Sequence, residues 1–225
     1  MPSSVFSHQA PGLLIKIKYP KIFDGTALCL GALIPDFNFI FDLFLDTNFY
    51  VFTHSLIGQF LWTIPITIIA TVIFSRYIGP LCARIASKKS RFYEPLRYFG
   101  VDQWNLLKKK KYLRKSWLII SYSALIGGIT HILLDFPAHK YFTILFPWFV
   151  GLNFGIFQYS LLDYGTITFG PFTFEANLTI YNLLWFLETV VTFILSLYLL
   201  RYIKRHNLIK KWYNESIPEN REHVI

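Results

Sequence analysis

The chain has few charged residues and very few cysteines. Charged residues make up 16% of its 225 positions, whereas hydrophobic residues make up 54% and aromatic residues 19%. Soluble globular domains carry about 25% charged residues, so this composition argues against that class. The two cysteines, Cys29 and Cys82, lie in separate apolar segments and show no CxxC spacing. The sequence therefore predicts neither a disulfide framework nor a thiolate metal site.

Acidic residues are scarce as well. Thirteen aspartates and glutamates stand against 22 lysines and arginines, which gives a net charge of +9. Such an excess can indicate nucleic-acid binding, but here the basic residues cluster beside apolar segments. That clustering is typical of the cytoplasmic loops of membrane proteins. We therefore predict a multi-pass protein of the cell membrane, with membrane lipid rather than nucleic acid as its surroundings.

The apolar runs predict an all-α fold, a polytopic bundle of membrane helices in one domain over residues 1–211, followed by a polar tail at 212–225. Two short runs, at 8–18 and 23–34, are separated by Tyr19-Pro20 and predict a helical hairpin too short to span a bilayer. Longer runs predict three membrane spans, at residues 56–74, 117–134 and 178–200.

The positions of the basic residues orient this bundle. The basic segment 76–115 is predicted to be a cytoplasmic loop, and the basic residues after Leu200 place the C-terminus on the same side. If the aromatic segment 141–160 also crossed the membrane, the basic C-terminus would lie on the outer side. We therefore predict that this segment is interfacial or re-entrant. Residues 37–53 are also predicted to be interfacial, and residues 161–176 to form a loop or a small hairpin.

Histidines and aspartates stand at the ends of these predicted helices. His131 and Asp135 are four residues apart, so they project from one helix face. Taken singly, such residues have ordinary explanations: a polar pair at a helix end, a turn aspartate after Pro35, a polar residue at a helix start. The candidate metal ligands are His8, Asp36, His54, His131, Asp135 and His139.

The predicted topology brings these candidates together. The hairpin places His8 and Asp36 at one end, and the first span starts at His54 on the outer side. The second span runs outward and delivers His131 and Asp135 to the same side. Neutral imidazoles and carboxylates are the ligands that Zn²⁺ takes from proteins. We therefore predict a site for a divalent metal ion, Zn²⁺ or a similar one, on the outer face.

The order of four short motifs resembles a known family. Ser7-His8, Gly31-Ala32-Leu33-Ile34-Pro35-Asp36-Phe37, Thr53-His54-Ser55 and Thr130-His131-Ile132-Leu133-Leu134-Asp135 resemble the membrane-bound metal-dependent hydrolases, and more distantly zinc-dependent phospholipase C. The likeness covers about residues 5–140. It implies that His8, Asp36, His54, His131 and Asp135 are ligands, with His139 as a sixth or as a supporting residue. The further His-x-x-x-Glu pair of phospholipase C is absent, so we expect one or two ions.

Two functional hypotheses follow. The first is a membrane-embedded, metal-dependent hydrolase in which metal-activated water attacks an ester or phosphodiester at the outer interface, a lipid being one candidate substrate. Asp36 or Asp135 would then be the catalytic general base. The second is a non-enzymatic membrane protein that keeps the His/Asp cluster as a structural or regulatory metal or proton site. Transport is disfavoured because the ionisable residues gather at one end of the predicted bundle.

Overall fold

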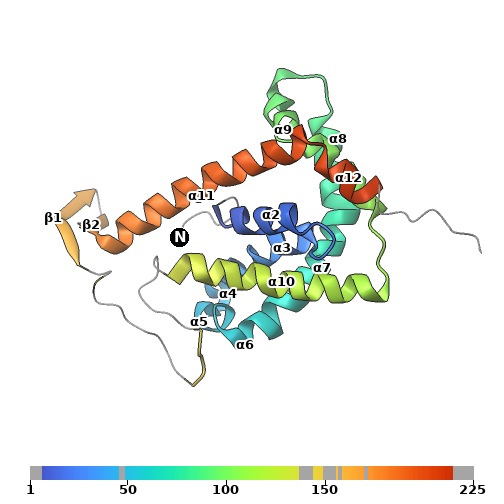
Figure 1. The fold of residues 1–225 in the computed structure, drawn as a ribbon. Helices are drawn as coiled ribbons and strands as arrows, with labels where there is room; N and C mark the ends of the chain where they lie inside the picture. Colours follow the sequence, from blue (N-terminus) through green and yellow to red (C-terminus); the bar gives the residue numbers. More distant parts are fainter. Residues whose placement is uncertain are drawn as a thin grey trace, which may run out of the picture.

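The computed structural model describes residues 7–45, 49–136, 144–148, 156, 159–169 and 172–214. This part of the chain is mostly helical and contains one small two-stranded sheet (Figure 1). Three helices are long and apolar enough to cross a membrane, at Leu56–Ala86, Arg114–Asp135 and Ile180–Arg205. The first two contain the predicted spans 56–74 and 117–134, and the third overlaps the predicted span 178–200 from residue 180 onward. The prediction of a purely helical protein is corrected only by the small sheet.

The predicted short hairpin is formed by α2 (Gln9–Lys18) and α3 (Gly25–Gly31). Asp24 begins α3, where its Oδ1 accepts a hydrogen bond from the backbone N–H of Ala27 at 2.9 Å. The chain then tightens into the 3₁₀ helix η1 (Ile34–Phe37), with Pro35 in its first turn. In Figure 1 the hairpin lies between the two long helices at Arg114–Asp135 and Ile180–Arg205.

The first long helix extends well past its predicted end. It runs without interruption through α6 (Leu56–Gly58), the π turn η2 (Gln59–Thr63), α7 (Ile64–Ile73), the π turn η3 (Phe74–Ile78) and α8 (Gly79–Ala86). Pro80 does not break it, because the π turn directly before Gly79-Pro80 accommodates the missing backbone N–H.

Much of the segment 76–115, predicted to be a cytoplasmic loop, is therefore helical, and its cytoplasmic location stays a prediction. After α8 come η4 (Arg91–Tyr93), α9 (Glu94–Tyr98) and the long 3₁₀ helix η5 (Val101–Lys109). The buried side chains of Ala83 and Ala86 lie on α8, which packs against η5. Burial of this apolar face explains why a segment with many basic residues still folds into helices.

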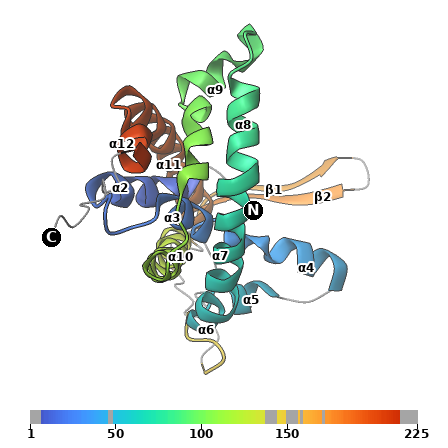
Figure 2. The same ribbon diagram turned by 90° about the vertical axis from the view of Figure 1, so that its right-hand side faces the viewer.

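Helix α10 (Arg114–Asp135) packs closely on α3 through glycines. A Cβ atom on Gly127 would lie 2.3 Å from the carbonyl oxygen of Leu28, and one on Gly31 would lie 2.4 Å from that of Ala124. Only glycine permits this approach of the two backbones. Figure 2 shows α10 nearly end-on while α7 and α8 stand upright, so the long helix crosses α10 steeply.

The remaining elements surround this centre. Residues 37–53 contain α4 (Asn38–Leu45) and α5 (Phe49–Thr53). Strands β1 (Ser160–Phe169) and β2 (Phe172–Thr179) form an antiparallel hairpin, which agrees with the small hairpin predicted at 161–176. The predicted segment 141–160 falls mostly outside the described residues. Finally, α11 (Ile180–Arg205) leads into α12 (Leu208–Asn214), so the first residues of the predicted polar tail are helical.

Candidate metal centre

Two histidines and two aspartates meet at one end of the fold. His131 and Asp135 lie on the last turns of α10, His54 directly precedes α6, and Asp36 lies in η1. Ser55 fixes the position of His54, because its Oγ caps the next helix by accepting from the N–H of Gly58 at 3.0 Å. One ligand atom from each of the four residues lies within 4.8 Å of all the others.

Five of the six distances between these atoms have the size that a tetrahedral metal site requires, and the sixth, between Asp36 and Asp135, is at most 4.8 Å. The two imidazole Nε2 atoms of His54 and His131 are 3.2 Å apart. Asp36 Oδ1 lies 3.4 Å from each of them, and Asp135 Oδ2 lies 3.5 Å from His54 and 3.2 Å from His131. A tetrahedron with bonds of about 2.0–2.1 Å, as for Zn²⁺, has edges of about 3.3–3.4 Å. The described residues therefore fit a single small divalent ion.

Hydrogen bonds on the far side of each imidazole orient both lone pairs toward the cluster. His131 Nδ1 lies 2.8 Å from the carbonyl oxygen of Ala32, and His54 Nδ1 lies 3.1 Å from that of Tyr50. A carbonyl oxygen can only accept, so each Nδ1 carries the hydrogen and each neutral imidazole presents a lone pair at Nε2. Two such lone pairs at 3.2 Å repel each other unless a proton or a cation lies between them.

Asp36 is held in its ionised form by the same neighbours. Burial of the side chain opposes ionisation, but when a proton rather than a metal ion is on Nε2, hydrogen bonds donated by His131 and His54 hold the pKa of the Asp36 carboxyl well below its usual range. Its side chain is 18% exposed, compared with 7% for Asp135 and 3% for His54. Asp36 is therefore the most accessible of the four candidate ligands.

A second group of side chains adjoins the four through Asp135. While Asp135 Oδ2 faces the two imidazoles, its Oδ1 lies 3.3 Å from Nε2 of His8. His8 Nε2 also lies 3.6 Å from Oε1 of Glu188, which projects from α11. The His8 ring packs edge-on against that of His131, with centroids 4.6 Å apart. Both carboxylate oxygens of Glu188 are buried, and neither has a hydrogen-bond partner among the described residues.

The structure thus brings together five of the six predicted ligands. His8 lies beside the tight group of four rather than within it, and His139 lies outside the described residues. Sequence reasoning did not assign Glu188 to the site, because no motif contains it. One feature of the sequence could have drawn attention to Glu188: it is the only acidic residue between residues 178 and 200. An ionisable side chain in such an apolar run is costly without a polar partner.

Comparison with known proteins assigns the chain to a family. The family model described as a domain of unknown function (DUF4184) matches residues 1–220. The chain belongs to the DUF4184 family. This family's description carries no activity, and the match gives no support to the resemblance to metal-dependent hydrolases or to zinc-dependent phospholipase C. No curated protein and no solved structure matches the chain. Any function of this DUF4184 chain must therefore be argued from its own site.

Proposed function

We propose that the chain is a membrane-embedded, divalent-metal-dependent hydrolase that acts on an ester or phosphodiester at the membrane interface. The observation that carries the proposal is the group of four ligand atoms at tetrahedral spacing, with His8 and Glu188 beside it. A divalent ion at this position would supply Lewis-acid catalysis and a nucleophilic water near neutral pH. Two nitrogens and two carboxylate oxygens are a donor set that suits Zn²⁺.

The side chains have distinct roles in this proposal. His54, His131 and Asp135 hold the ion, and the carbonyl oxygens of Tyr50 and Ala32 keep both imidazoles in the required tautomer. Asp36 also contributes Oδ1, and because it is the most exposed of the four we assign its other oxygen, Oδ2, the role of general base. Asp135 joins this position to His8, so a second ion or a polar substrate group could occupy the space beside Glu188.

The proposal also assigns the candidate metal centre to one side of the membrane. The cluster lies at the end of α10 remote from Arg114, whereas the basic residues of the 76–115 segment gather toward the other end of that helix. Under the positive-inside rule the basic end faces the cytoplasm and the metal centre faces outward. A lipid whose headgroup lies at that interface is the substrate class that such a location favours.

One observation favours the non-enzymatic alternative, a structural metal site. Four protein ligands already complete a tetrahedron, and structural zinc sites are closed in this way, whereas catalytic sites keep one position open. A closed site, however, would have no use for His8 and Glu188. Glu188 is buried beside the cluster with neither oxygen hydrogen-bonded among the described residues, which is costly unless another ion or a substrate meets it. We therefore favour the hydrolase.

Hydrolysis assays on the reconstituted protein separate the two functions. Zinc-loaded wild-type protein should cleave at least one member of a panel of phospholipids, aryl esters and aryl phosphodiesters, and Asp135→Asn should lose both metal and activity. Asp163→Asn is the matched control, because Asp163 is exposed on β1 and its bond from the Gly165 N–H can be kept by asparagine. Bound metal without cleavage of any panel member would contradict the hydrolase and support the structural site.

A further inference from the structure

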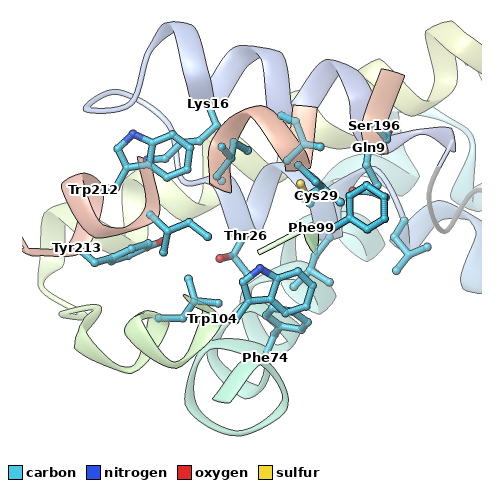
Figure 3. Close-up of a pocket in the computed structure, with 18 residues that line it drawn as sticks. Gln9, Lys16, Thr26, Cys29, Phe74, Phe99, Trp104, Ser196, Trp212 and Tyr213 are labelled. Carbon is cyan, nitrogen blue, oxygen red and sulfur yellow. The ribbon is translucent and has the colours of Figure 1, made fainter. Parts of the chain in front are cut away.

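A separate cavity of ≈ 320 Å³ lies between the α2–α3 hairpin and helices α11 and α12 (Figure 3). None of the metal-centre residues lines it. Ligand pockets in proteins usually measure about 300–1,000 Å³, so this cavity is at the lower end of the range. Along α2 it extends from Gln9 to Lys16, which corresponds to about 10 Å at the rise of an α-helix. These dimensions suit one narrow ligand.

The walls of the cavity are mainly hydrocarbon and aromatic. Residues of α2, α3, η3, η5, α11 and α12 contribute, among them Leu13, Leu30, Phe74, Trp104, Leu200 and Ile203. The rings of Phe74 and Trp104 contact each other, with centroids 5.4 Å apart. Such a lining favours an alkyl chain, because transfer of apolar surface out of water is stabilising.

One end of the cavity carries a buried cation. The Lys16 ammonium donates hydrogen bonds to the carbonyl oxygens of Pro20 at 2.6 Å and Phe23 at 2.8 Å. It also lies 5.0 Å from the ring centre of Trp212, as Figure 3 lets the reader follow. An ammonium group has three donors, so these two carbonyl oxygens leave one donor unused. Gly25 leaves room for this side chain, since a Cβ there would lie 2.9 Å from Lys16 Cγ.

The charges around Lys16 do not balance. Asp24 is the carboxylate that acts on both Lys16 and Lys110, and its Oδ2 already pairs with the Lys110 ammonium at 2.5 Å. Burial lowers the pKa of Lys16 to about 8, with Asp24 opposing the shift and Lys110 adding to it. Lys16 therefore stays mostly protonated at neutral pH. Two buried ammonium groups and one carboxylate leave an excess positive charge, which an anion would compensate.

We propose that this cavity binds one fatty acid, with its carboxylate on the Lys16 ammonium and its alkyl chain between α2 and α11. The charge excess selects an anionic head, and the apolar walls select a hydrocarbon tail. The volume admits one chain, which favours a fatty acid over a diacyl phospholipid with its two chains. The proposal is independent of the metal centre and of any hydrolytic activity.

Photolabelling in phosphatidylcholine nanodiscs tests the proposal. A diazirine derivative of hexadecanoic acid should label peptides that line the cavity, and hexadecanoate should compete while methyl hexadecanoate should not. Lys16→Met should lower this labelling about tenfold, because it removes a charge-assisted hydrogen bond in a buried setting. Lys18→Met is the matched control, since Lys18 lies on the same helix but is exposed.

A second pair of variants keeps the test decisive if Lys16→Met fails to fold. Leu200→Trp fills the cavity and should abolish labelling, whereas Leu187→Trp, at a 48% exposed position on the same helix, should not. Equal competition by the methyl ester, or unchanged labelling in Lys16→Met and Leu200→Trp, would overturn the proposal. Stronger labelling of the cavity by a photoreactive phospholipid would also overturn it, by assigning a diacyl lipid as the occupant.

Discussion

The described part of the chain contains two buried clusters of ionisable side chains, and they differ in their balance of charge. At the candidate metal centre, two carboxylates and two imidazoles converge, with His54 and His131 Nε2 3.2 Å apart and Asp135 Oδ2 3.2 Å from His131 Nε2. At the far end of the hairpin, Asp24 pairs with Lys110, and two backbone carbonyls accept hydrogen bonds from Lys16. The first cluster needs a proton or a cation between its imidazoles, whereas the second is an ion pair with one extra ammonium. A buried charge alone does not identify a ligand-binding site. A buried cluster with unbalanced charge does, because burial of an uncompensated charge is costly.

The largest expected effect is on metal binding at the first cluster. His131→Ala removes one of four ligands and leaves two carboxylates less well neutralised, so the affinity for Zn²⁺ should fall at least ~100-fold. Titration of purified protein against a competing chelator measures this affinity. His206→Ala is the control, because His206 is exposed and hydrogen-bonds only locally, to the carbonyl oxygen of Tyr202. Equal Zn²⁺ affinities in His131→Ala and His206→Ala would show that the first cluster does not bind the ion, and would contradict the proposed difference between the two clusters.

Substitution in the second cluster should change the stability of the fold rather than metal binding. Asp24→Asn keeps the helix cap but leaves the Lys110 and Lys16 ammonium groups without their carboxylate, so the free energy of unfolding should fall by about 3 kcal/mol. Metal affinity should not change. Unfolding in mixed micelles by denaturant measures the loss.

Asp102→Asn provides the matched ion-pair control for that experiment. Asp102 pairs with Lys204 at 2.6 Å, but both side chains are about a quarter exposed. A pair open to solvent contributes little, so the expected loss is below about 1 kcal/mol. If the two variants lose equal stability, the buried cluster has no special structural role.

Glu188→Gln tests whether Glu188 contributes to metal binding beside the group of four ligands. Glutamine keeps the shape of the side chain but removes a charge 3.6 Å from His8. We expect a second zinc equivalent to be lost, or the affinity for the first to fall about tenfold, as for supporting residues around metal sites. Native mass spectrometry counts the bound ions. Glu94→Gln, an exposed position on α9, should behave as wild type; wild-type stoichiometry together with wild-type affinity in Glu188→Gln would exclude Glu188 from the site.

The smallest predicted effect is a dependence of fatty-acid binding on pH. The folded-state pKa of Lys16, about 8, lies below the usual value for lysine, so its charge is present at pH 7 and is lost as the pH rises through 8. The carboxylate of the ligand stays ionised over this range. Asp24, Lys110 and Tyr213 are the other ionisable groups at this end of the cavity. Affinity for hexadecanoate should fall about fourfold between pH 7 and 8.5, and Lys16→Met should abolish this dependence.

Much of the metal centre could be predicted from the sequence, because its ligands stand at helix ends whose positions follow from hydrophobic runs and charge asymmetry. His131 and Asp135 share a helix face by spacing alone, and the hairpin and first span bring Asp36 and His54 to them. Glu188 could not be placed in this way, since its approach depends on how α11 packs against α2. The extension of the first helix through Pro80 also needs a π turn that no local pattern reveals.

The hairpin end of the molecule was less predictable for a physical reason. Lys16 and Lys110 have the sequence pattern of exposed lysines, and the basic run at 108–111 has the pattern of a cytoplasmic loop. Both side chains are nevertheless buried, at 7% and 8% exposure. Their burial depends on Asp24, which lies 86 residues before Lys110 in the chain, and on α12, whose Trp212 contacts Lys16. Such pairing at long range leaves no periodic signal.

The central claim is that Asp36, His54, His131 and Asp135 hold one divalent ion between them. X-ray absorption at the zinc edge, on protein purified without chelators and reconstituted with Zn²⁺, tests it most directly. We predict a shell of four nitrogen and oxygen donors at about 2.0–2.1 Å with the outer scattering of two imidazole rings, and loss of that signal in His131→Ala. A shell of water oxygens only, or an unchanged spectrum in His131→Ala, would contradict the account.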